Sequence, residues 1–368
     1  MAGPLNSISR RRFVRLAAAT SLGLLAGSAA VADDASRPRQ PLKLGFDNFS
    51  LRSMGWKAPE LIDYAAQLKV DSLFISDLNA FESLEASHLG KLRARAVDLG
   101  LRIHVGTWSI CPTASQFKKD WGTAAELLAL GIRVAKDLGS PVLRVILGTH
   151  EDRLSAGGIQ ARIKDTVAVL KGARTRAQDA GVRIAMENHA GDMHSRELVQ
   201  LIEAAGKDFV GANIDSGNAA WTLEEPLGNF EILAPYALTT SLRDTAVWPS
   251  QHGVTAQWTA MGDGMVDWKK YFARFAELCP DTPVHIETIS GFPRELRVND
   301  KQFWQGWPQG KPAGYDRFVA WAATGQARKP HKLPEGVDKK LAQQRFERDE
   351  LEQSLRYCKS LGLGRRDA

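Results

Sequence analysis

Cysteine is scarce in this sequence: the 368 residues include only Cys111, Cys279 and Cys358. None of them belongs to a C-x-x-C pair. Their odd number and wide spacing argue against a disulfide framework and against a structural zinc site. We therefore expect all three to be small, buried apolar side chains.

Glycine-rich phosphate loops and long apolar runs are also missing. No G-x-G-x-x-G motif follows the first predicted strand, which counts against a doubly wound dinucleotide-binding sheet. The later predicted strands carry no phosphate-binding glycine loop either. Beyond residue 32 no apolar segment approaches the length that spans a bilayer, so we predict no stable membrane span.

Excess charge is confined to the two ends of the chain. The formal net charge is +6, yet residues 1–32 carry four arginines and no acid, and residues 326–368 carry eleven basic and seven acidic side chains. The stretch between them is therefore close to −2. A body of this charge does not resemble a nucleic-acid-binding domain, and we predict no nucleic-acid partner.

The first 32 residues resemble an export signal. Arg10 and Arg11 precede an apolar stretch at 16–31, and Ala30-Val31-Ala32 has the small-x-small pattern of a cleavage site. This arrangement predicts a twin-arginine signal peptide at 1–32, cleaved after Ala32, followed by a linker at 33–40. The expected location of the mature protein is periplasmic or otherwise exported.

From residue 41 onward, short β-branched runs alternate with helical patterns. The predicted strands are 42–50, 72–76, 102–109, 142–148, 182–188, 210–217, 237–244 and 283–290. The predicted helices are 59–68, a segment ending at 99, 124–138, 159–180, 196–205, 226–233, 267–278 and 315–323. Eight strands, each followed by a helix, predict an α/β fold, a (β/α)8 TIM barrel over residues 41–325. Glycines after Leu99, Leu138 and Ala180 fit left-handed helix caps. Residues 326–368 are expected to be a linker and a charged C-terminal helix packed on the barrel or on a neighbour.

Acidic side chains close several of the later strands. Glu187 ends the fifth strand, Asp215 the sixth and Glu287 the eighth. In a barrel of this kind the carboxyl ends of the strands meet at one face, so these three side chains are expected to point into one mouth.

Three neighbouring carboxylates repel one another, and one divalent cation is the simplest compensation. Oxygen ligands favour Mg²⁺ or Mn²⁺, and an added imidazole would admit Zn²⁺ or Co²⁺. The alternative for each acid taken alone is a helix cap or an ion-pair partner.

The motifs MENHAGD, NIDSGN, TTSLRD, MGDGMVD and VHIETIS resemble those of the xylose-isomerase-like TIM-barrel superfamily, which includes sugar-phosphate isomerases and epimerases. The resemblance implies one divalent metal bound by Glu, Asp, His and Glu on strands five to eight. Glu187, Asp215 and Glu287 match three of these ligands, but Ser241 stands at the histidine position. His285 is a possible substitute, although a buried barrel histidine is the commoner case. The resemblance places His189 beside the metal, in contact with substrate.

In this family a metal-stabilised enediolate supports isomerisation, epimerisation, elimination and decarboxylation. The resemblance implies that Glu187 or Glu287 is the base and that His189 handles protons or orients the substrate. Arg243 is expected to bind substrate oxygens, or else to pair with Asp244 or Asp263. Asn218 is a further substrate-binding candidate. Four tryptophans in or near the loops are sugar-stacking or packing candidates: Trp108, Trp221, Trp248 and Trp258.

Three functions remain open from the sequence. The first is a metal-dependent isomerase or epimerase of a small sugar or oxo-sugar. The second is a lyase on the same scaffold, either an oxo-sugar-acid decarboxylase or a 3-oxo-glycoside eliminase. The third is a non-catalytic sugar-binding protein, which the serine at 241 makes conceivable. Phosphorylated substrates are not expected for an exported protein.

Overall fold

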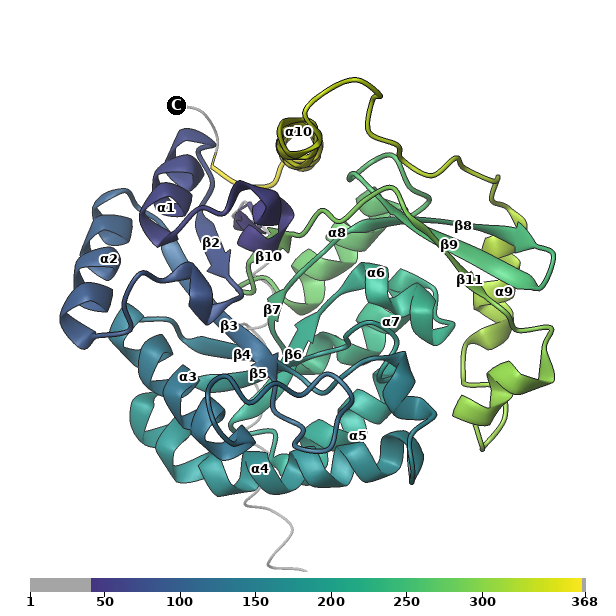
Figure 1. Cartoon of the computed structure of the whole chain (residues 1–368), viewed down its shortest axis with the longest axis horizontal. Helices are drawn as coiled ribbons and strands as arrows, with labels where there is room; N and C mark the ends of the chain where they lie inside the picture. Colours follow the sequence, from purple (N-terminus) through teal and green to yellow (C-terminus); the bar gives the residue numbers. More distant parts are fainter. Residues whose placement is uncertain (1–40, 366–368) are drawn as a thin grey trace, which may run out of the picture. The chain divides into compact units, whose positions relative to one another are not determined.

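Eight parallel strands form the centre of the structure, a computed structural model that describes residues 41–365 (Figure 1). The strands are β1 (Leu44–Asp47), β2 (Ser72–Ile75), β3 (Arg102–Ser109), β4 (Val142–Ile146), β5 (Arg183–Glu187), β6 (Val210–Ile214), β7 (Ala237–Thr240) and β10 (Val284–Ile286). Strands β1 to β7 pair in sequence order, and β1 also pairs with β10. A parallel bridge between Leu242 and Ile286 joins the two remaining edges, so the predicted barrel is confirmed.

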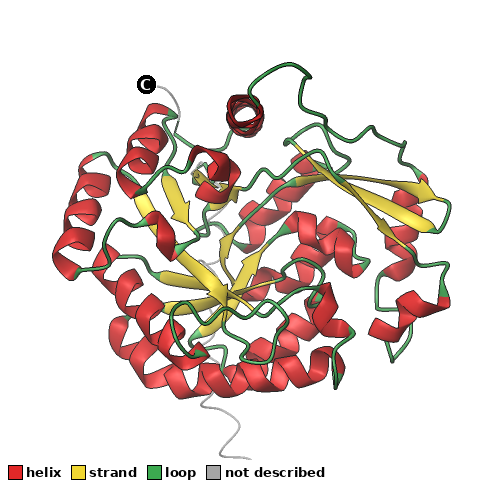
Figure 2. Ribbon diagram, in the orientation of Figure 1, coloured by secondary structure: helices red, strands yellow, loops and turns green. Residues whose placement is uncertain are grey.

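Most of the helices lie around this barrel, as Figure 2 shows. The helices of residues 41–365 are α1 (Ala58–Gln67), α2 (Ala86–Asp98), α3 (Ala124–Leu138), α4 (Gly158–Ala180), α5 (Ser195–Ala205), α6 (Ser216–Ala219), α7 (Pro226–Leu233), α8 (Trp268–Leu278), α9 (Tyr315–Ala323) and α10 (Lys339–Ser360). Local chemistry sets their ends. Thr123 and Glu126 form a capping box at the start of α3, and Gly139 ends that helix with a φ of 73°. The glycine caps predicted from the sequence are therefore present.

Several strands end earlier than the sequence pattern predicted, because polar residues at their carboxyl ends turn the chain. Asp47 ends β1, and its side chain accepts a hydrogen bond from the Phe49 backbone N–H at the start of a 3-10 helix, η1 (Asn48–Met54). Asp215 follows β6 and accepts from the backbone N–H groups of Gly217 and Asn218. These acids thus cap short helices and also lie at the mouth of the barrel.

A small antiparallel sheet was not predicted. After β7 the chain forms the hairpin of β8 (Asp244–Ser250) and β9 (Gly253–Thr259), and β11 (Pro293–Leu296) adds to β9. The predicted seventh strand at 237–244 is therefore wrong at its end, since β7 stops at Thr240 and Asp244 begins β8. The hairpin extends the connection between β7 and α8 and contributes side chains to the site.

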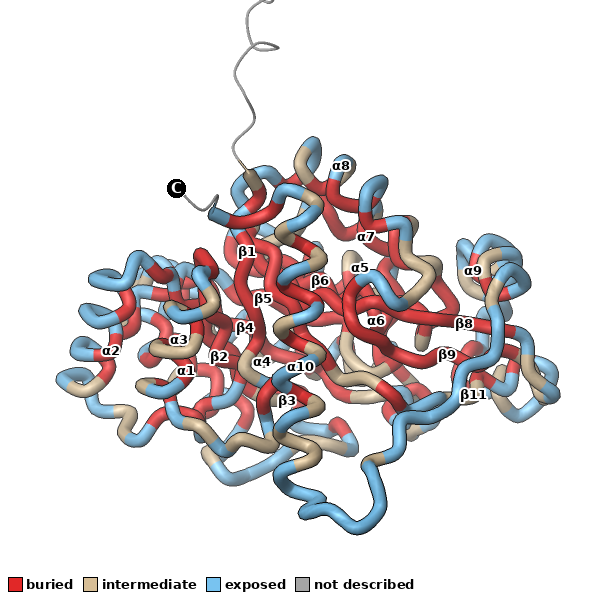
Figure 3. The backbone as a smooth tube through the Cα atoms, turned by 90° about the horizontal axis from the view of Figure 1, so that it is seen from above, coloured by how far each residue is buried: buried red, intermediate tan, exposed pale blue. Residues whose placement is uncertain are grey.

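Of the two last helices, α10 packs on the barrel as expected, whereas α9 occupies a different place. Phe318 and Ala322 of α9, predicted to follow the eighth strand onto the barrel, pack instead in a second apolar core with Val247 of β8. It is α10 that contacts β1 and β10, and its Leu351 and Leu355 belong to the main core. Figure 3 shows the exposed connection that leads from α9 to α10.

Residues 41–365 contain no helix that is both long and apolar enough to cross a bilayer. All three cysteines are buried and unpaired, as predicted. The predicted signal peptide and linker at 1–40 lie outside the described residues.

Candidate active site

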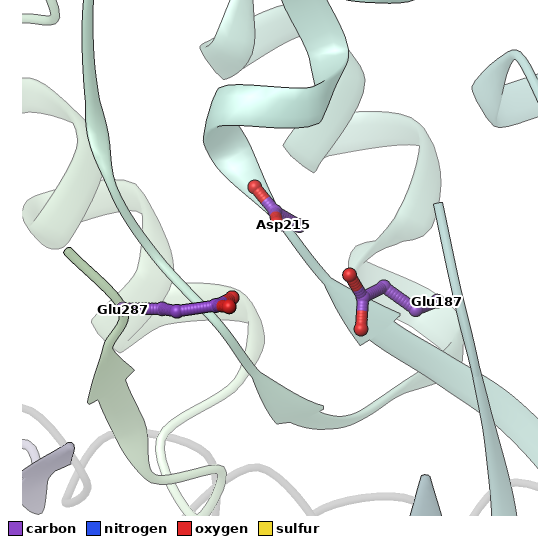
Figure 4. A group of neighbouring side chains, drawn as sticks. All are labelled: Glu187, Asp215 and Glu287. Carbon is purple, nitrogen blue, oxygen red and sulfur yellow. The ribbon is translucent and has the colours of Figure 1, made fainter. Parts of the chain in front are cut away.

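The three predicted carboxylates meet at the mouth of the barrel. Glu187 is the last residue of β5, Asp215 follows β6, and Glu287 follows β10. Oxygens of all three lie within 4.8 Å of one another, and all three side chains are buried. Figure 4 shows them pointing toward a common centre. We call Glu187, Asp215 and Glu287 the carboxylate cluster.

Two buried arginines enter this cluster. Nη2 of Arg243, which follows β7, forms ion pairs with Oδ2 of Asp215 at 2.5 Å and with Oε2 of Glu287. Nε of Arg144, in the middle of β4, lies 2.5 Å from Oε2 of Glu187. Every member of the cluster is therefore paired with a guanidinium group. The predicted alternative partners of Arg243, Asp244 and Asp263, do not contact its guanidinium in this way.

Ser241 lies beside the cluster, next to a fourth buried acid. Its hydroxyl accepts a hydrogen bond from Nδ2 of Asn213 at 3.2 Å, and the same amide group donates to Oε2 of Glu187 at 2.9 Å. The hydroxyl also donates to Oδ2 of Asp47 over 3.5 Å. The side chain at the family's histidine position is thus directed into the mouth and is engaged by two polar neighbours.

Asn218 links two of the carboxylates. Its Nδ2 donates to Oδ2 of Asp215 at 2.6 Å and more weakly to Oε1 of Glu187 at 3.4 Å. Its Oδ1 atom is buried and has no hydrogen-bond partner among the described residues. An unpaired acceptor at this depth is costly unless a ligand or an ion satisfies it.

His189 has a defined proton arrangement. Its Nδ1 lies 2.7 Å from the carbonyl oxygen of Gly148, which can only accept, so Nδ1 carries the proton. Burial lowers the pKa of His189, although the nearby Glu187 opposes this shift. The imidazole is accordingly neutral near pH 7, and its Nε2 is free to accept a proton.

The charges of the cluster are strongly coupled. Burial raises the pKa of Asp215 to about 7, against the opposing effect of Arg243. Burial also raises the pKa of Glu287 well above its usual range. Burial also acts to raise the pKa of Glu187, but Arg144, His189 and Arg243 together outweigh it, so the pKa of that carboxyl is lowered. Burial of so many acids is expensive, and two arginines compensate for it only in part.

A cavity of about 310 Å³ opens above these groups. Its lining includes the predicted site residues Trp108, His189, Asn218, Arg243, Trp258 and Glu287. Phe49, Trp121 and Phe292 add further aromatic surface, and Lys118 adds a cation. Aromatic faces beside polar groups suit the two kinds of surface of a sugar.

Three predicted candidates lie elsewhere. Nε2 of His285 contacts Ser72 Oγ at 2.9 Å and its Nδ1 contacts Thr239 Oγ1, so it belongs to the barrel interior and is not a substitute ligand. Trp221 stacks on Trp258 with ring centroids 4.4 Å apart but does not line the cavity. Trp248 is buried in β8 and also lies outside the lining.

Sequence reasoning missed Asp47, Arg144 and Asn213. For each of them the sequence contains a feature that could have indicated a role in the site. Asp47 directly follows the apolar run Leu44-Gly45-Phe46, and Arg144 interrupts the apolar strand VLRVI. A charge inside a fully buried parallel strand is expensive and indicates a partner in the barrel. Asn213 lies on β6, two residues before Asp215, and its side chain also points into the barrel, where it donates to Glu187.

Comparison with known proteins places this arrangement in a family. The model of the xylose isomerase-like TIM barrel family matches residues 51–305, and the chain belongs to this family. The 3-oxo-isoapionate decarboxylase of Pectobacterium atrosepticum is 21% identical over 210 residues, which cover 56% of this chain and 69% of that protein. The predicted resemblance to the superfamily is thereby confirmed.

Solved structures agree with the fold. D-psicose 3-epimerase, crystallised in the presence of D-fructose, is similar with a TM-score of 0.57 at 13% identity, over 87% of this chain and 99% of that chain. The IOLI protein with a binding zinc atom gives a TM-score of 0.53 at 13% identity, over 76% of this chain and 95% of that chain. At these identities the likeness shows the fold alone. The prediction of an isomerase, epimerase or lyase type of enzyme agrees with these relatives.

The side chains at the mouth fit a hard divalent cation. Four buried acids, the cluster and Asp47, face two buried arginines, so the fully ionised acids would carry two more negative charges than the arginines neutralise. The available donors are carboxylate and amide oxygens, including the unpartnered Oδ1 of Asn218, and such donors suit Mg²⁺ or Mn²⁺ better than Zn²⁺. Glu187, Asp215 and Glu287 are the residues that would hold the ion.

Proposed function

We propose that this protein is an isomerase or epimerase that moves a proton next to the carbonyl group of a small sugar or oxo-sugar, with one divalent cation at the carboxylate cluster. The observation that carries the proposal is the convergence of Glu187, Asp215 and Glu287 within 4.8 Å at the base of an aromatic-lined cavity. Mg²⁺ or Mn²⁺ suits the oxygen donors best, and Zn²⁺ or Co²⁺ is the alternative.

A bound divalent cation supplies Lewis-acid polarisation of a carbonyl, which acidifies the neighbouring C–H bond. The chain supplies the proton acceptor and the orientation. Glu187 and Glu287 are candidates for the base: Glu287 lines the cavity, and an oxygen of the buried Glu187 lies within 4.8 Å of an oxygen of Glu287. His189 can receive or return a proton at Nε2, since its Nδ1 proton is committed to the Gly148 carbonyl.

Other side chains would bind the substrate. Arg243 and Asn218 line the cavity as hydrogen-bond donors for hydroxyl or carbonyl oxygens. Trp108 offers aromatic surface to the apolar side of a sugar, and its Nε1 is already satisfied by the carbonyl of Gln116. Trp258 also lines the cavity, but its ring already contacts Trp221 and Arg243, so it would meet the sugar with its edge. Its Nε1 is satisfied by the carbonyl of Gly217.

A lyase activity is the second candidate, and the decarboxylase relative favours it. Proton abstraction beside a carbonyl and loss of CO₂ from a β-oxo acid pass through the same type of enolate. The same site therefore suits an oxo-sugar-acid decarboxylase, or an eliminase of 3-oxo-glycosides. The predicted export signal supports unphosphorylated substrates.

The test is solvent exchange with a panel of ketoses, oxo-sugar acids and 3-oxo-glycosides in D₂O, with Mn²⁺ or Mg²⁺ added. An isomerase or epimerase introduces deuterium beside the carbonyl, and nuclear magnetic resonance detects the exchange. Evolved CO₂ or a released aglycone identifies the lyase instead. The Glu287→Gln variant should show neither. Absence of exchange and of product with every compound, in protein shown to hold the metal, would contradict the proposal.

A further inference from the structure

Arg243 forms ion pairs with two of the three carboxylates that would hold a cation at the carboxylate cluster. Its Nη2 bridges Oδ2 of Asp215 and Oε2 of Glu287, the only side chains of the described residues to which this guanidinium forms ion pairs. Arg144, in contrast, is directed to Glu187 and to the carbonyl of Thr107. One of the two guanidinium groups therefore stands between two of the three proposed metal ligands.

Packing and hydrogen bonds, in addition to charge, fix the position of the Arg243 side chain. Its Cζ lies 4.3 Å from the ring centroid of Trp258, whose Nε1 donates to the carbonyl of Gly217. A side chain at residue 217 would overlap with the stem of Arg243, so glycine leaves the path open. The backbone N–H of Arg243 donates to Ser216 Oγ, and that hydroxyl donates to the Arg243 carbonyl. This packing holds the guanidinium over the cluster.

Ser241, at the fourth ligand position, makes a metal ion more dependent on the carboxylates that Arg243 occupies. Ser241 provides a neutral hydroxyl, which is engaged by Asn213 and Asp47, where the family places an imidazole. A cation must therefore rely on the three carboxylates and on Oδ1 of Asn218, and Arg243 already pairs with two of these carboxylates. Like charges a few ångströms apart in a poorly solvated site repel strongly.

We infer that Arg243 is a built-in counter-cation that competes with the divalent metal for Asp215 and Glu287 and so sets the metal affinity of the site. The inference rests on the proposed metal site. It differs from a role of Arg243 in substrate binding alone, because it requires the arginine to weaken metal binding when no substrate is present.

The test is calorimetric titration of chelator-treated protein with Mn²⁺. Arg243→Met removes the charge and keeps much of the length of the side chain, whereas Arg243→Lys keeps the charge. We expect Arg243→Met to bind Mn²⁺ at least about tenfold more tightly than the unchanged protein, because a neighbouring like charge is removed. Arg243→Lys should stay within a few fold of the unchanged protein.

Arg153→Met is the matched control. Arg153 is also a buried arginine, and its guanidinium pairs with both carboxylate oxygens of Glu197, away from the cluster. Its loss should leave the Mn²⁺ affinity unchanged. If Arg243→Met does not fold, Mg²⁺ titration of the unchanged protein gives a second readout. Displacement of the guanidinium from Trp258 should alter the tryptophan emission, and the change should be absent in Trp258→Phe; no change at saturating Mg²⁺ overturns the inference.

The outcomes separate the inference from the proposed function. Equal affinities of Arg243→Met and the unchanged protein, or weaker binding by the variant, overturn the inference and leave the metal site standing. Binding by Arg243→Met alone supports the inference and overturns the metal requirement of the natural enzyme. Absence of binding in both proteins overturns both.

Discussion

His189 is the residue whose chemistry the structure defines most narrowly. Its Nδ1 proton is held by the Gly148 carbonyl, its ring meets Trp108 edge to face at 5.6 Å, and its Nε2 remains for the substrate. Such an arrangement fixes the tautomer, as a proton-transfer group requires.

The His189→Gln variant should lower kcat by about 10²- to 10⁴-fold, the usual contribution of a general acid or base. KM should change much less, because the amide retains hydrogen-bonding capacity. Steady-state kinetics on the compound identified by deuterium exchange provide the measurement, with the surface variant His252→Gln as control. A kcat within threefold of the unchanged enzyme would show that His189 does not transfer a proton.

At the same scale, the sequence predicted the acids of the site but not their counter-charges. Glu187, Asp215 and Glu287 end apolar runs, and barrel geometry alone brings strand ends together. The three ion pairs depend on which strands become neighbours and on where each arginine side chain points, which no local pattern contains. Arg144 lies on β4, next to the strand that carries Glu187, and Asp47 ends β1, which pairs with the strand before Glu287. Their partners therefore follow from the strand pairing of the closed barrel and not from spacing along the chain.

Among the elements, the interior of the barrel carries a titratable group that the mechanism does not use. His104 on β3 contacts Thr239 Oγ1 at 2.9 Å and packs against His285, with ring centroids 5.0 Å apart. Burial lowers the pKa of His104 to about 3, below the ordinary histidine value of 6.5. The folded protein therefore keeps this imidazole neutral, and the unfolded chain binds the proton first.

The resulting contribution to stability is present above pH 6.5 and is lost as the pH falls toward 3. Its slope is about 1.4 kcal/mol per pH unit for one proton. Urea unfolding of the unchanged protein and of His104→Gln at several pH values between 7.5 and 5 should show a steeper decline for the unchanged protein. Parallel declines would mean that His104 does not resist protonation.

The C-terminal helix is the second element with a measurable role. Leu355 of α10 is buried in the main core, whereas Leu341 on the same helix is 53% exposed. The helix also holds η1, since Glu347 accepts from the Ser53 backbone N–H at 2.9 Å. That segment carries Phe49, which lines the cavity.

Leu355→Ala should reduce the free energy of unfolding by about 2–5 kcal/mol, the range for a buried leucine. Leu341→Ala should change it by less than about 0.5 kcal/mol, as surface substitutions do. Chemical denaturation of the two variants is a direct comparison. Similar losses for both would argue that α10 is only loosely attached to the barrel.

The sequence identified most of these elements but not all of their roles. Helices 124–138, 226–233 and 315–323 agree with α3, α7 and α9. A capping box marks the start of α3, and Glu225 followed by Pro226 marks the start of α7. The sequence pattern did not predict the β8–β9 hairpin, which lies in the long connection between the predicted seventh strand and its helix. The strand that pairs with β9, β11, is only four residues long and mostly polar. The place of α10 against β1 and β10 depends on contacts across almost the whole chain length, which periodicity does not reveal.

At the scale of the whole molecule, we expect the predicted signal peptide at 1–32 to direct the protein out of the cytoplasm. Changing Arg10 and Arg11 together to lysine should leave the protein in the cytoplasm with residues 1–32 attached, because the twin-arginine pair is the recognition element. Cell fractionation and the mass of the intact chain measure both effects, and Arg15→Lys serves as control. Normal export of the double variant would indicate a different route.

The central claim is that the carboxylate cluster binds a metal ion, and it can be tested by the metal content of the whole chain. The measurement is the metal content of protein prepared without chelator and dialysed against Mn²⁺, determined by elemental analysis. We predict about one Mn²⁺ per chain, as for a single-ion site. Replacement of both Glu187 and Glu287 by glutamine should abolish binding. Glu224→Gln, which changes a buried acid outside the cluster that accepts from Ser195, should retain the metal. Full occupancy in the double variant, or no metal in the unchanged protein, would contradict the account.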